Sequence, residues 1–306
     1  MMKIICYGSC HGLGGAEKTV RTLLAEMSKR GHEVYIVSKQ KVDDISIISP
    51  EKLWQIADRN SVIYTAKTPV YPLWLEAKKR GIRTVHEYLT SVTRFPRLRT
   101  LPKPDYIVFN SNWTRLQYPK IKSSTVINPL IDLSEYKITE TNKHYIGMIN
   151  PCRYKGSDIV KCLSEKFPDD TFSLGGGWKL WYYPIKIPAT KNVIWNGYDI
   201  DMNKFYSELD ILIVPSHSES YGRVIIEAMY FNCAVIASNV GGIPEAMGDG
   251  GYLVNNYLNC ADWEKALTEV KNNLGHYKSI AKQRVNKYDY EDNVDKWEKV
   301  FIGDFQ

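Results

Sequence analysis

The stretch Val214-Pro-Ser-His-Ser-Glu219-Ser-Tyr221-Gly222-Arg223-Val-Ile-Ile-Glu227 is the most informative part of this 306-residue sequence. It continues an apolar run, Asp210-Ile-Leu-Ile-Val214, which is typical of a buried strand in a parallel sheet. Pro215 ends that strand, and Gly222 precedes a helix with apolar residues on one side. Open α/β sheets bind their ligands where the strands end, so a binding site is expected at residues 215–222.

Two carboxylates flank the start of the predicted helix, Glu219 before it and Glu227 within it. Between them, the backbone amides at Tyr221, Gly222 and Arg223 are expected to point toward an anion, because the first amides of a helix have no acceptor inside it. The Arg223 side chain adds positive charge. A sugar–diphosphate–ribose ligand has hydroxyls at both ends and negative charge in the middle, which suits this order. The plainer alternative is a strand and a helix with two surface acids.

Strand and helix patterns alternate along the chain on both sides of a polar linker at residues 139–143. Such alternation predicts βαβ units and parallel sheets. The expected fold is therefore α/β, with two Rossmann-like, doubly wound domains that face a cleft. Their expected bounds are 1–139 and 140–289, and residues 290–306 form a final segment. An amphipathic helix in that segment places four apolar residues on one face: Val294, Trp297, Val300 and Phe301.

Composition narrows the class of protein. No apolar run approaches the ~20 residues that span a bilayer. Six cysteines without a C-x-x-C pair indicate reduced thiols and a cytoplasmic location. Residues 1–137 hold 22 Lys and Arg against 12 Asp and Glu, whereas the rest holds 18 against 22. The basic first part, including the loop from Arg94 to Lys103, favours an anionic partner such as a membrane surface, and therefore peripheral membrane association. No nucleic-acid partner is expected, because no recognised motif accompanies these charges.

A glycine-rich turn, Gly12-Leu-Gly14-Gly15-Ala-Glu17, joins the first predicted strand to the first helix. Glycines allow backbone amides to approach a phosphate closely. The turn nearly matches a P-loop, but Glu17 stands where that motif has its second glycine, and a carboxylate there would repel phosphates. A P-loop phosphotransferase is therefore a lesser alternative.

Two further segments follow predicted strands. His86 closes the strand that begins at Arg83, and its place after the strand favours a binding cleft. Arg153 and Lys155 lie in one strand-to-helix loop, where two cations suit a diphosphate. The Asp199-Ile-Asp201 spacing matches a metal-binding D-x-D motif, but Asp directly before a helix is better explained as a cap, so no metal is expected.

Together these motifs resemble the retaining glycosyltransferases of family 4, which have the GT-B fold. The E-x7-E pair Glu219/Glu227, the Gly14-Gly15 turn, His86 and Lys155-Gly156 occur in the family's order. The resemblance implies that His86 and Glu219 are catalytic residues at the donor sugar and that Glu227 holds the ribose. It implies diphosphate contacts from Gly14, Gly15, Arg153, Lys155, Tyr221, Gly222 and Arg223, and base contacts from Gly197 and Tyr198. It also implies that the helix in residues 290–306 crosses back to the N-terminal domain. Met148 departs from the family, which has Arg there, so Arg153 would have to replace it.

The implied activity is metal-independent transfer of a hexose from a UDP- or GDP-sugar to a hydroxyl, with retention of the anomeric configuration. The acceptor would be a glycan, or a lipid-linked or protein-linked hydroxyl. No cofactor is expected besides the nucleotide-sugar, which is a co-substrate. The missing arginine at Met148 keeps one alternative open, a non-catalytic GT-B adaptor that binds a nucleotide-sugar.

Overall fold

The computed structural model describes residues 1–8, 14–38, 45–89, 103–176 and 184–304. The chain divides into two compact units, which are described separately. Unit 1 comprises Met1–Ile131 together with Asp289–Gln306, and unit 2 comprises Asp132–Tyr288. The first boundary therefore lies earlier than the polar linker expected to separate the domains. Gly12, Cys10 and most of the basic loop from Arg94 to Lys103 fall outside the described residues.

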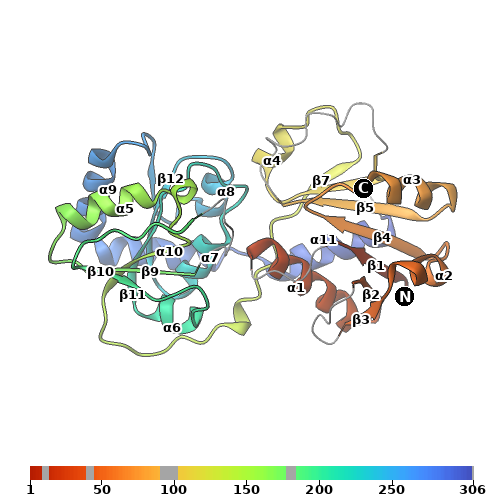
Figure 1. The fold of residues 1–306 in the computed structure, drawn as a ribbon, viewed down its shortest axis with the longest axis horizontal. Coiled ribbons are helices and arrows are strands. Elements are labelled where there is room, and N and C mark those ends of the chain that lie inside the picture. Colours follow the sequence, from red (N-terminus) through yellow and green to blue (C-terminus); the bar gives the residue numbers. More distant parts are fainter. Residues whose placement is uncertain (9–13, 39–44, 90–102, 177–183, 305–306) are drawn as a thin grey trace. The chain divides into compact units, whose positions relative to one another are not determined.

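The strands of unit 1 form a parallel sheet in the order β3-β2-β1-β4-β5-β6-β7 (Figure 1). They are β1 (Lys3–Tyr7), β2 (Glu33–Val37), β3 (Ser46–Ile48), β4 (Ser61–Ala66), β5 (Arg83–Tyr88), β6 (Tyr106–Phe109) and β7 (Ser124–Val126). The chain extends the sheet first in one direction from β1 and then in the other. This is the doubly wound order, and it brings the carboxyl ends of β1 and β4 together at the reversal point.

Both faces of this sheet are covered by helices. Helix α1 (Gly15–Lys29) packs on one face, where Ile4 and Cys6 of β1 point, and Ile5 points to the other face. That second face is covered by α2 (Leu53–Ile56), which follows the 3-10 turn η1 (Pro50–Lys52), and by α3 (Tyr71–Lys79). Helix α4 (Asn112–Leu116) lies between β6 and β7. The alternation follows from the two-residue period of a strand.

Helix α11 (Tyr290–Ile302) belongs to unit 1 although it comes last in the chain, and it contacts α1 (Figure 1). The four apolar residues expected on its buried face are all buried. Trp297 and Phe301 both meet the Tyr64 ring edge-on, at centroid distances of 5.6 Å. On the rim, Arg30 pairs with Asp295 at 2.7 Å. Packing of this face therefore holds the segment on unit 1.

Unit 2 has a second parallel sheet, in the order β10-β9-β8-β11-β12-β13. Its strands are β8 (Tyr145–Ile149), β9 (Phe172–Gly175), β10 (Val193–Trp195), β11 (Leu209–Val214), β12 (Ala234–Ser238) and β13 (Tyr252–Val254). Its α-helices are α5 (Ser157–Lys166), α6 (Met202–Ser207), α7 (Arg223–Tyr230), α8 (Ile243–Met247), α9 (Cys260–Asn272) and α10 (Leu274–Val285). Two 3-10 turns, η2 (Leu133–Glu135) and η3 (Arg153–Lys155), complete it. The predicted α/β class with two parallel sheets is thus confirmed.

Helices α5 and α9 share one face of this sheet, while α7 and α10 contact each other and β12. Cys162 of α5 and Cys260 of α9 form a disulfide, with 6.3 Å between their Cα atoms. The expectation of reduced thiols throughout was therefore wrong at these two positions. It rested on spacing along the sequence, which does not report that two helices lie side by side. Cys6, Cys152 and Cys233 are buried and do not take part in a disulfide.

Three short edge strands, β3, β7 and β13, were not foreseen from the sequence. Each has three residues, too few to show a period. Asp201 does cap α6, as predicted, because its carboxylate accepts from the amide of Asn203 at 2.9 Å. Within the described ranges, none of the helices combines the length and apolar character needed to cross a bilayer.

Replacing Trp297 with Ala should lower the free energy of unfolding of unit 1 by about 3–5 kcal/mol, because it leaves a large cavity between α11 and the sheet. Urea titration followed by circular dichroism measures this change. Lys296→Ala is the matched control on the exposed side of the same helix and should change stability by less than about 0.5 kcal/mol. A similar small effect for Trp297→Ala would contradict the described docking of α11.

Candidate donor-binding site

The strands β8 and β11 are neighbours in unit 2, and the loops that follow them meet at the carboxyl edge of the sheet. Gly156 has a left-handed backbone, with φ of 84°. A Cβ atom at this position would lie 2.1 Å from the carbonyl oxygen of Pro215. The His217 amide also donates to the Tyr154 carbonyl at 3.1 Å. The loop containing Lys155 and the loop containing Glu219 are thus held together by contacts that only glycine permits.

Lys155 and Glu219, two of the predicted site residues, form an ion pair across these loops. The ammonium group of Lys155 donates to Oε2 of Glu219. The side chains are mostly covered, with exposed fractions of 13% and 18%. Because both side chains are mostly covered, solvent screens this pair less than it would screen an exposed one. The cation expected to hold a diphosphate therefore lies directly beside the carboxylate expected to hold sugar hydroxyls.

The Glu219 backbone is fixed from the opposite side by the Gly241-Gly242 turn that precedes α8. The Gly242 amide donates to the Glu219 carbonyl at 2.9 Å. Cβ atoms at Gly241 and Gly242 would lie 2.0 Å from the carbonyl oxygens of Glu219 and Ser220 respectively. The loop 215–222 therefore packs against glycines on two sides. These contacts restrict the position of the Glu219 backbone and so the region that its carboxylate can reach.

The same loop leads into α7. Gly222 has φ of 100°, which allows the sharp turn into the helix. Tyr221 is buried, so its contribution to a ligand would come from its backbone. The first amides of α7 are the positive end of the helix and have no acceptor inside it. The structure thus has a helix start after β11, and anion binding by its amides stays a prediction.

Glu227 lies inside α7 and its carboxylate is already engaged. Tyr206 of α6 donates its hydroxyl to Oε2 at 2.8 Å, and Arg223 lies 3.4 Å from Oε1. The Arg223 guanidinium is thus turned toward Glu227 along the helix, so the expected charge contribution to a diphosphate is limited to its backbone. Tyr206 was missed by sequence reasoning, since nothing in the local pattern of α6 distinguishes it from a core tyrosine.

Three other predicted residues of unit 2 do not join this cluster. Arg153 points into solvent, with 77% of its side chain exposed, and lies 3.9 Å from Asp158. Gly197 and Tyr198 follow β10, two strands away from β8. The Gly197 carbonyl accepts from the Gly176 amide at 2.9 Å, and the Tyr198 ring packs edge-on against Trp195. They remain predictions for contacts with a base.

In unit 1, Gly14 and Gly15 stand at the start of α1, as expected. Glu17, whose carboxylate argued against a P-loop, pairs with Lys67, which follows β4. Lys67 is one of the few non-glycine residues with a positive φ, at 65°. Sequence reasoning missed it, although a lysine directly after a buried strand was a visible signal.

His86 lies within β5 rather than after it, because the strand continues to Tyr88. The imidazole is fully buried between the rings of Trp74 and Tyr88. Its Nδ1 lies 2.8 Å from the Thr65 hydroxyl. Burial lowers the pKa of His86 to about 3, so the ring is neutral. The predicted end of the strand at His86 is therefore wrong, and the ring is fully buried within unit 1.

Glu87, the next residue, points to the opposite face of the sheet and is also fully buried. Tyr64 donates its hydroxyl to Oε2 of Glu87, while Oε1 has no hydrogen-bond partner. Burial raises the pKa of Glu87 to about 7, although the hydrogen bond from Tyr64 acts the other way. Unit 1 therefore holds a carboxyl group that is largely protonated below neutral pH.

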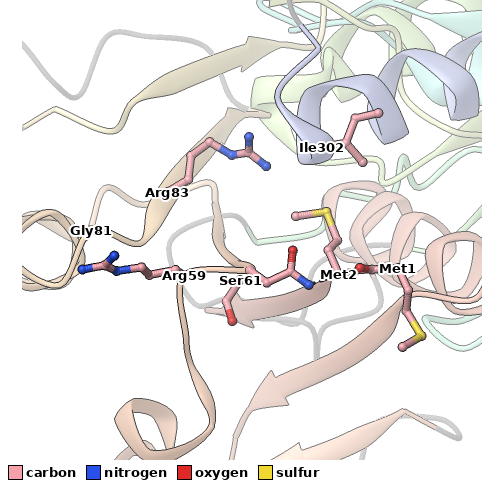
Figure 2. Close-up of a pocket in the computed structure, with 8 residues that line it drawn as sticks. Met1, Met2, Arg59, Ser61, Gly81, Arg83 and Ile302 are labelled. Atoms are coloured by element: carbon pink, nitrogen blue, oxygen red, sulfur yellow. Dashed lines mark hydrogen bonds between the residues drawn. The ribbon is translucent and has the colours of Figure 1, made fainter.

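A cavity of about 260 Å³ lies at the other edge of the unit 1 sheet, where β1, β4 and β5 begin. Its lining consists of Met1, Met2, Arg59, Asn60, Ser61, Gly81, Arg83 and Ile302. Figure 2 shows Arg83 extending toward Ile302 at the end of α11, whereas Arg59 points away. A helix C-terminus carries partial negative charge, which stabilises a guanidinium. None of the predicted site residues lines this cavity. The charge of Arg83 is explained by the C-terminus of α11 nearby, so it does not require a ligand.

Replacing Gly242 with Ala should distort the Glu219 loop, since the new Cβ would overlap the Ser220 carbonyl. The expected loss of stability is about 1–3 kcal/mol or more, as for other overpacked sites. Gly275→Ala in α10 is the matched control, because nothing lies within 4 Å of its Cβ position. It should be neutral or stabilising by up to about 1 kcal/mol. Equal thermal unfolding midpoints for both variants would contradict the glycine contact.

The raised pKa of Glu87 predicts a pH-dependent difference between wild type and Glu87→Gln. The folded state binds the Glu87 proton more tightly than the unfolded chain, so wild-type stability is lost as pH rises from about 4.5 to 7. The stability of Glu87→Gln relative to wild type should therefore increase by up to about 1.4 kcal/mol per pH unit in that window and level off above it. Urea titrations at several pH values measure this, and a constant difference would refute it.

Part of this chain is similar in sequence to known proteins. Residues 186–287, which lie in unit 2 and include both Glu219 and Glu227, match the family model described as Glycosyl transferases group 1. The D-inositol 3-phosphate glycosyltransferase of Mycobacterium sp. (strain KMS) is 30% identical over 148 residues, 43% of this chain and 32% of that protein. An uncharacterized 41.2 kDa protein in the cps region of Klebsiella pneumoniae is 28% identical over 118 residues, 36% of this chain and 32% of that protein. The matches thus span less than a third of these relatives.

Solved structures are similar over nearly the whole chain. Sucrose-phosphate synthase from Thermosynechococcus elongatus has a TM-score of 0.77 at 17% identity and covers 98% of each chain. Anabaena HepE, solved in complex with UDP-glucose, has a TM-score of 0.78 at 16% identity, covering 98% of this chain and 99% of that one. WaaG, a glycosyltransferase involved in lipopolysaccharide biosynthesis, has 0.73 at 13% identity, with 98% and 99% covered. The chain therefore has the fold of GT-B glycosyltransferases, and residues 186–287 match the Glycosyl transferases group 1 family.

Proposed function

We propose that this protein is a retaining glycosyltransferase that moves a hexose from a UDP- or GDP-sugar to a hydroxyl of a glycan, lipid-linked or protein-linked acceptor. The observation that carries the proposal is the Lys155–Glu219 pair at the carboxyl edge of the unit 2 sheet, where the loop after β8 meets the loop that leads from β11 into α7. Cation, carboxylate and helix amides are the groups that a sugar diphosphate requires. The relatives named glycosyltransferases and the UDP-glucose complex of Anabaena HepE support the same activity.

In the proposed reaction, the bond between the anomeric carbon and the diphosphate oxygen breaks while the acceptor oxygen bonds to the same face of the sugar. The acceptor proton moves to the departing diphosphate, so no protein nucleophile is needed. Charge that develops on the diphosphate is stabilised by Lys155 and by the amides at Tyr221, Gly222 and Arg223. A preorganised donor of this kind is worth about 10²–10³ in rate. These groups supply the positive charge, so the proposed mechanism uses no metal ion.

The remaining contacts follow from the resemblance. Glu219 orients hydroxyls of the donor sugar, and Glu227, held by Tyr206, accepts from the ribose. Gly14 and Gly15 keep the diphosphate role, and Gly197 and Tyr198 the base-binding role, that the resemblance implies. Arg153 reaches the diphosphate only if its exposed side chain swings inward. Because His86 is buried, we assign no donor contact to it.

A non-catalytic protein that binds a nucleotide-sugar is the second candidate. Met148, which replaces the family arginine, is 1% exposed and packs in the core, so this position supplies no cation. Such an adaptor would bind a nucleotide-sugar but neither transfer nor hydrolyse it.

The proposal also includes docking of the protein on an anionic membrane surface, where it would meet its acceptor. The support is the basic charge of unit 1, whose α4 presents Arg115 beside Leu116, with 74% of the latter exposed. Vesicles with anionic headgroups would attract such a surface at low salt.

Thermal unfolding with UDP-, GDP- and ADP-sugars tests the donor site. One of them should raise the midpoint by about 5 °C at a hundredfold excess over its Kd. Lys155→Met should weaken its binding at least tenfold and lower turnover by about 10²–10³. Lys161→Met, which removes a lysine with 63% of its side chain exposed, should leave both unchanged.

Product analysis separates the two candidates. Transfer with retention of the anomeric configuration, seen by proton NMR of the product, supports the enzyme, and binding without turnover supports the adaptor. A protein stabilised by none of these nucleotide-sugars would contradict both.

A further inference from the structure

The Lys155–Glu219 ion pair has a consequence for which ligands the site prefers. Both side chains already satisfy each other, and both are mostly covered, with 13% and 18% exposed. A diphosphate that takes Lys155 as its partner therefore has to compete with Glu219. Removing one partner from a covered ion pair is costly, because the other charge is left without compensation.

A nucleotide-sugar and a bare nucleoside diphosphate differ in how far they replace the interactions lost when the Lys155–Glu219 pair separates. The nucleotide-sugar offers its diphosphate to Lys155 and its sugar hydroxyls to Glu219, so both charges find new partners. The bare diphosphate occupies Lys155 but offers Glu219 no donor. It leaves a carboxylate close to its own negative charge, and like charges at short range repel.

Glu219 has little freedom to avoid this repulsion. Its carbonyl accepts from the Gly242 amide at 2.9 Å, and glycine contacts grip its loop on both sides. Lys155, in contrast, has a flexible four-carbon stem that can swing between partners. The Glu219 backbone is therefore held in place, and the longer side chain of the lysine can move further between partners.

We propose that Glu219 determines specificity for donor over product by competing with the diphosphate for Lys155. In the absence of a sugar it reclaims the lysine and so promotes release of the nucleoside diphosphate after transfer. This inference rests on the proposed function, but it makes a separate statement, since Glu219 then acts against the product as well as on the sugar.

Calorimetric titration of wild type and Glu219→Gln with three pairs of ligands tests it: UDP and UDP-glucose, GDP and GDP-mannose, ADP and ADP-glucose. The neutral amide cannot hold Lys155 as an ion pair. Glu219→Gln should therefore bind the nucleoside diphosphate about tenfold more tightly than wild type, a change of about 1.4 kcal/mol. Its affinity for the nucleotide-sugar should stay equal or fall, so that the preference for donor is lost. Damage to the fold would weaken binding, so tighter product binding is specific to the proposed role.

Asp158→Asn is the matched control. It removes one negative charge from α5 near the same loop, but Asp158 has 64% of its side chain exposed and faces Arg153 instead. Its affinities should equal those of wild type. A comparable gain in product affinity for Asp158→Asn would mean that net charge alone is responsible, which overturns the inference.

The outcomes separate the two proposals. If wild type binds none of the six ligands, the proposed function and this inference both fail. If wild type binds them and Glu219→Gln binds the nucleoside diphosphate no more tightly, only this inference fails. Should Glu219→Gln not fold, Glu219→Asp provides the second test. Its shorter side chain weakens the ion pair and should strengthen product binding by a smaller factor, and unchanged product affinity there would overturn the inference.

Discussion

The close approach of two backbone segments, Gly156 to Pro215, is the constraint on which the candidate site depends. Because a Cβ atom at Gly156 would lie 2.1 Å from the Pro215 carbonyl, only glycine allows the β8 and β11 loops to meet there. Their contact places Lys155 beside Glu219. A second glycine contact, at Gly242, holds the Glu219 backbone in position. The chemistry of the site is therefore set by backbone sterics before any side chain contributes.

The two units treat buried carboxylates differently. In unit 2, Glu219 and Glu227 have cations beside them, Lys155 and Arg223. In unit 1, Glu87 has a tyrosine hydroxyl but no cation among the described residues, and burial raises its pKa. Acids paired with cations therefore lie where ligands are expected to bind, and an acid without a cation supports the inner packing under α11. Burial alone does not distinguish these cases, whereas the partner of each carboxylate does.

The sequence was most informative where an apolar pattern repeats over a long segment, or where glycines mark the loops between strands and helices. The alternation of strands and helices predicted the α/β class, and the spacing of Val294, Trp297 and Phe301 predicted the buried face of α11, which the structure confirms. The Lys155-Gly156 loop and Glu219 were located from their positions after strands. Contacts across the fold were not predictable, because the Lys155–Glu219 pair, the Tyr206–Glu227 hydrogen bond and the disulfide each join distant segments. His86 was misplaced since the end of a strand depends on its neighbours in the sheet, and β6 extends β5 to Tyr88.

The position of α11 has a consequence for synthesis of the chain. Unit 2 is continuous, so all its parts are available once Tyr288 has left the ribosome. Unit 1 needs the segment after that residue, and until it arrives the apolar side chains that α11 covers, such as Tyr64, stay in contact with water. Unit 1 would thus be completed after unit 2, although its first residues are synthesised earlier. During that interval the exposed apolar surface of the nascent chain promotes aggregation. Binding of chaperones or rapid synthesis of the remaining residues would reduce this aggregation.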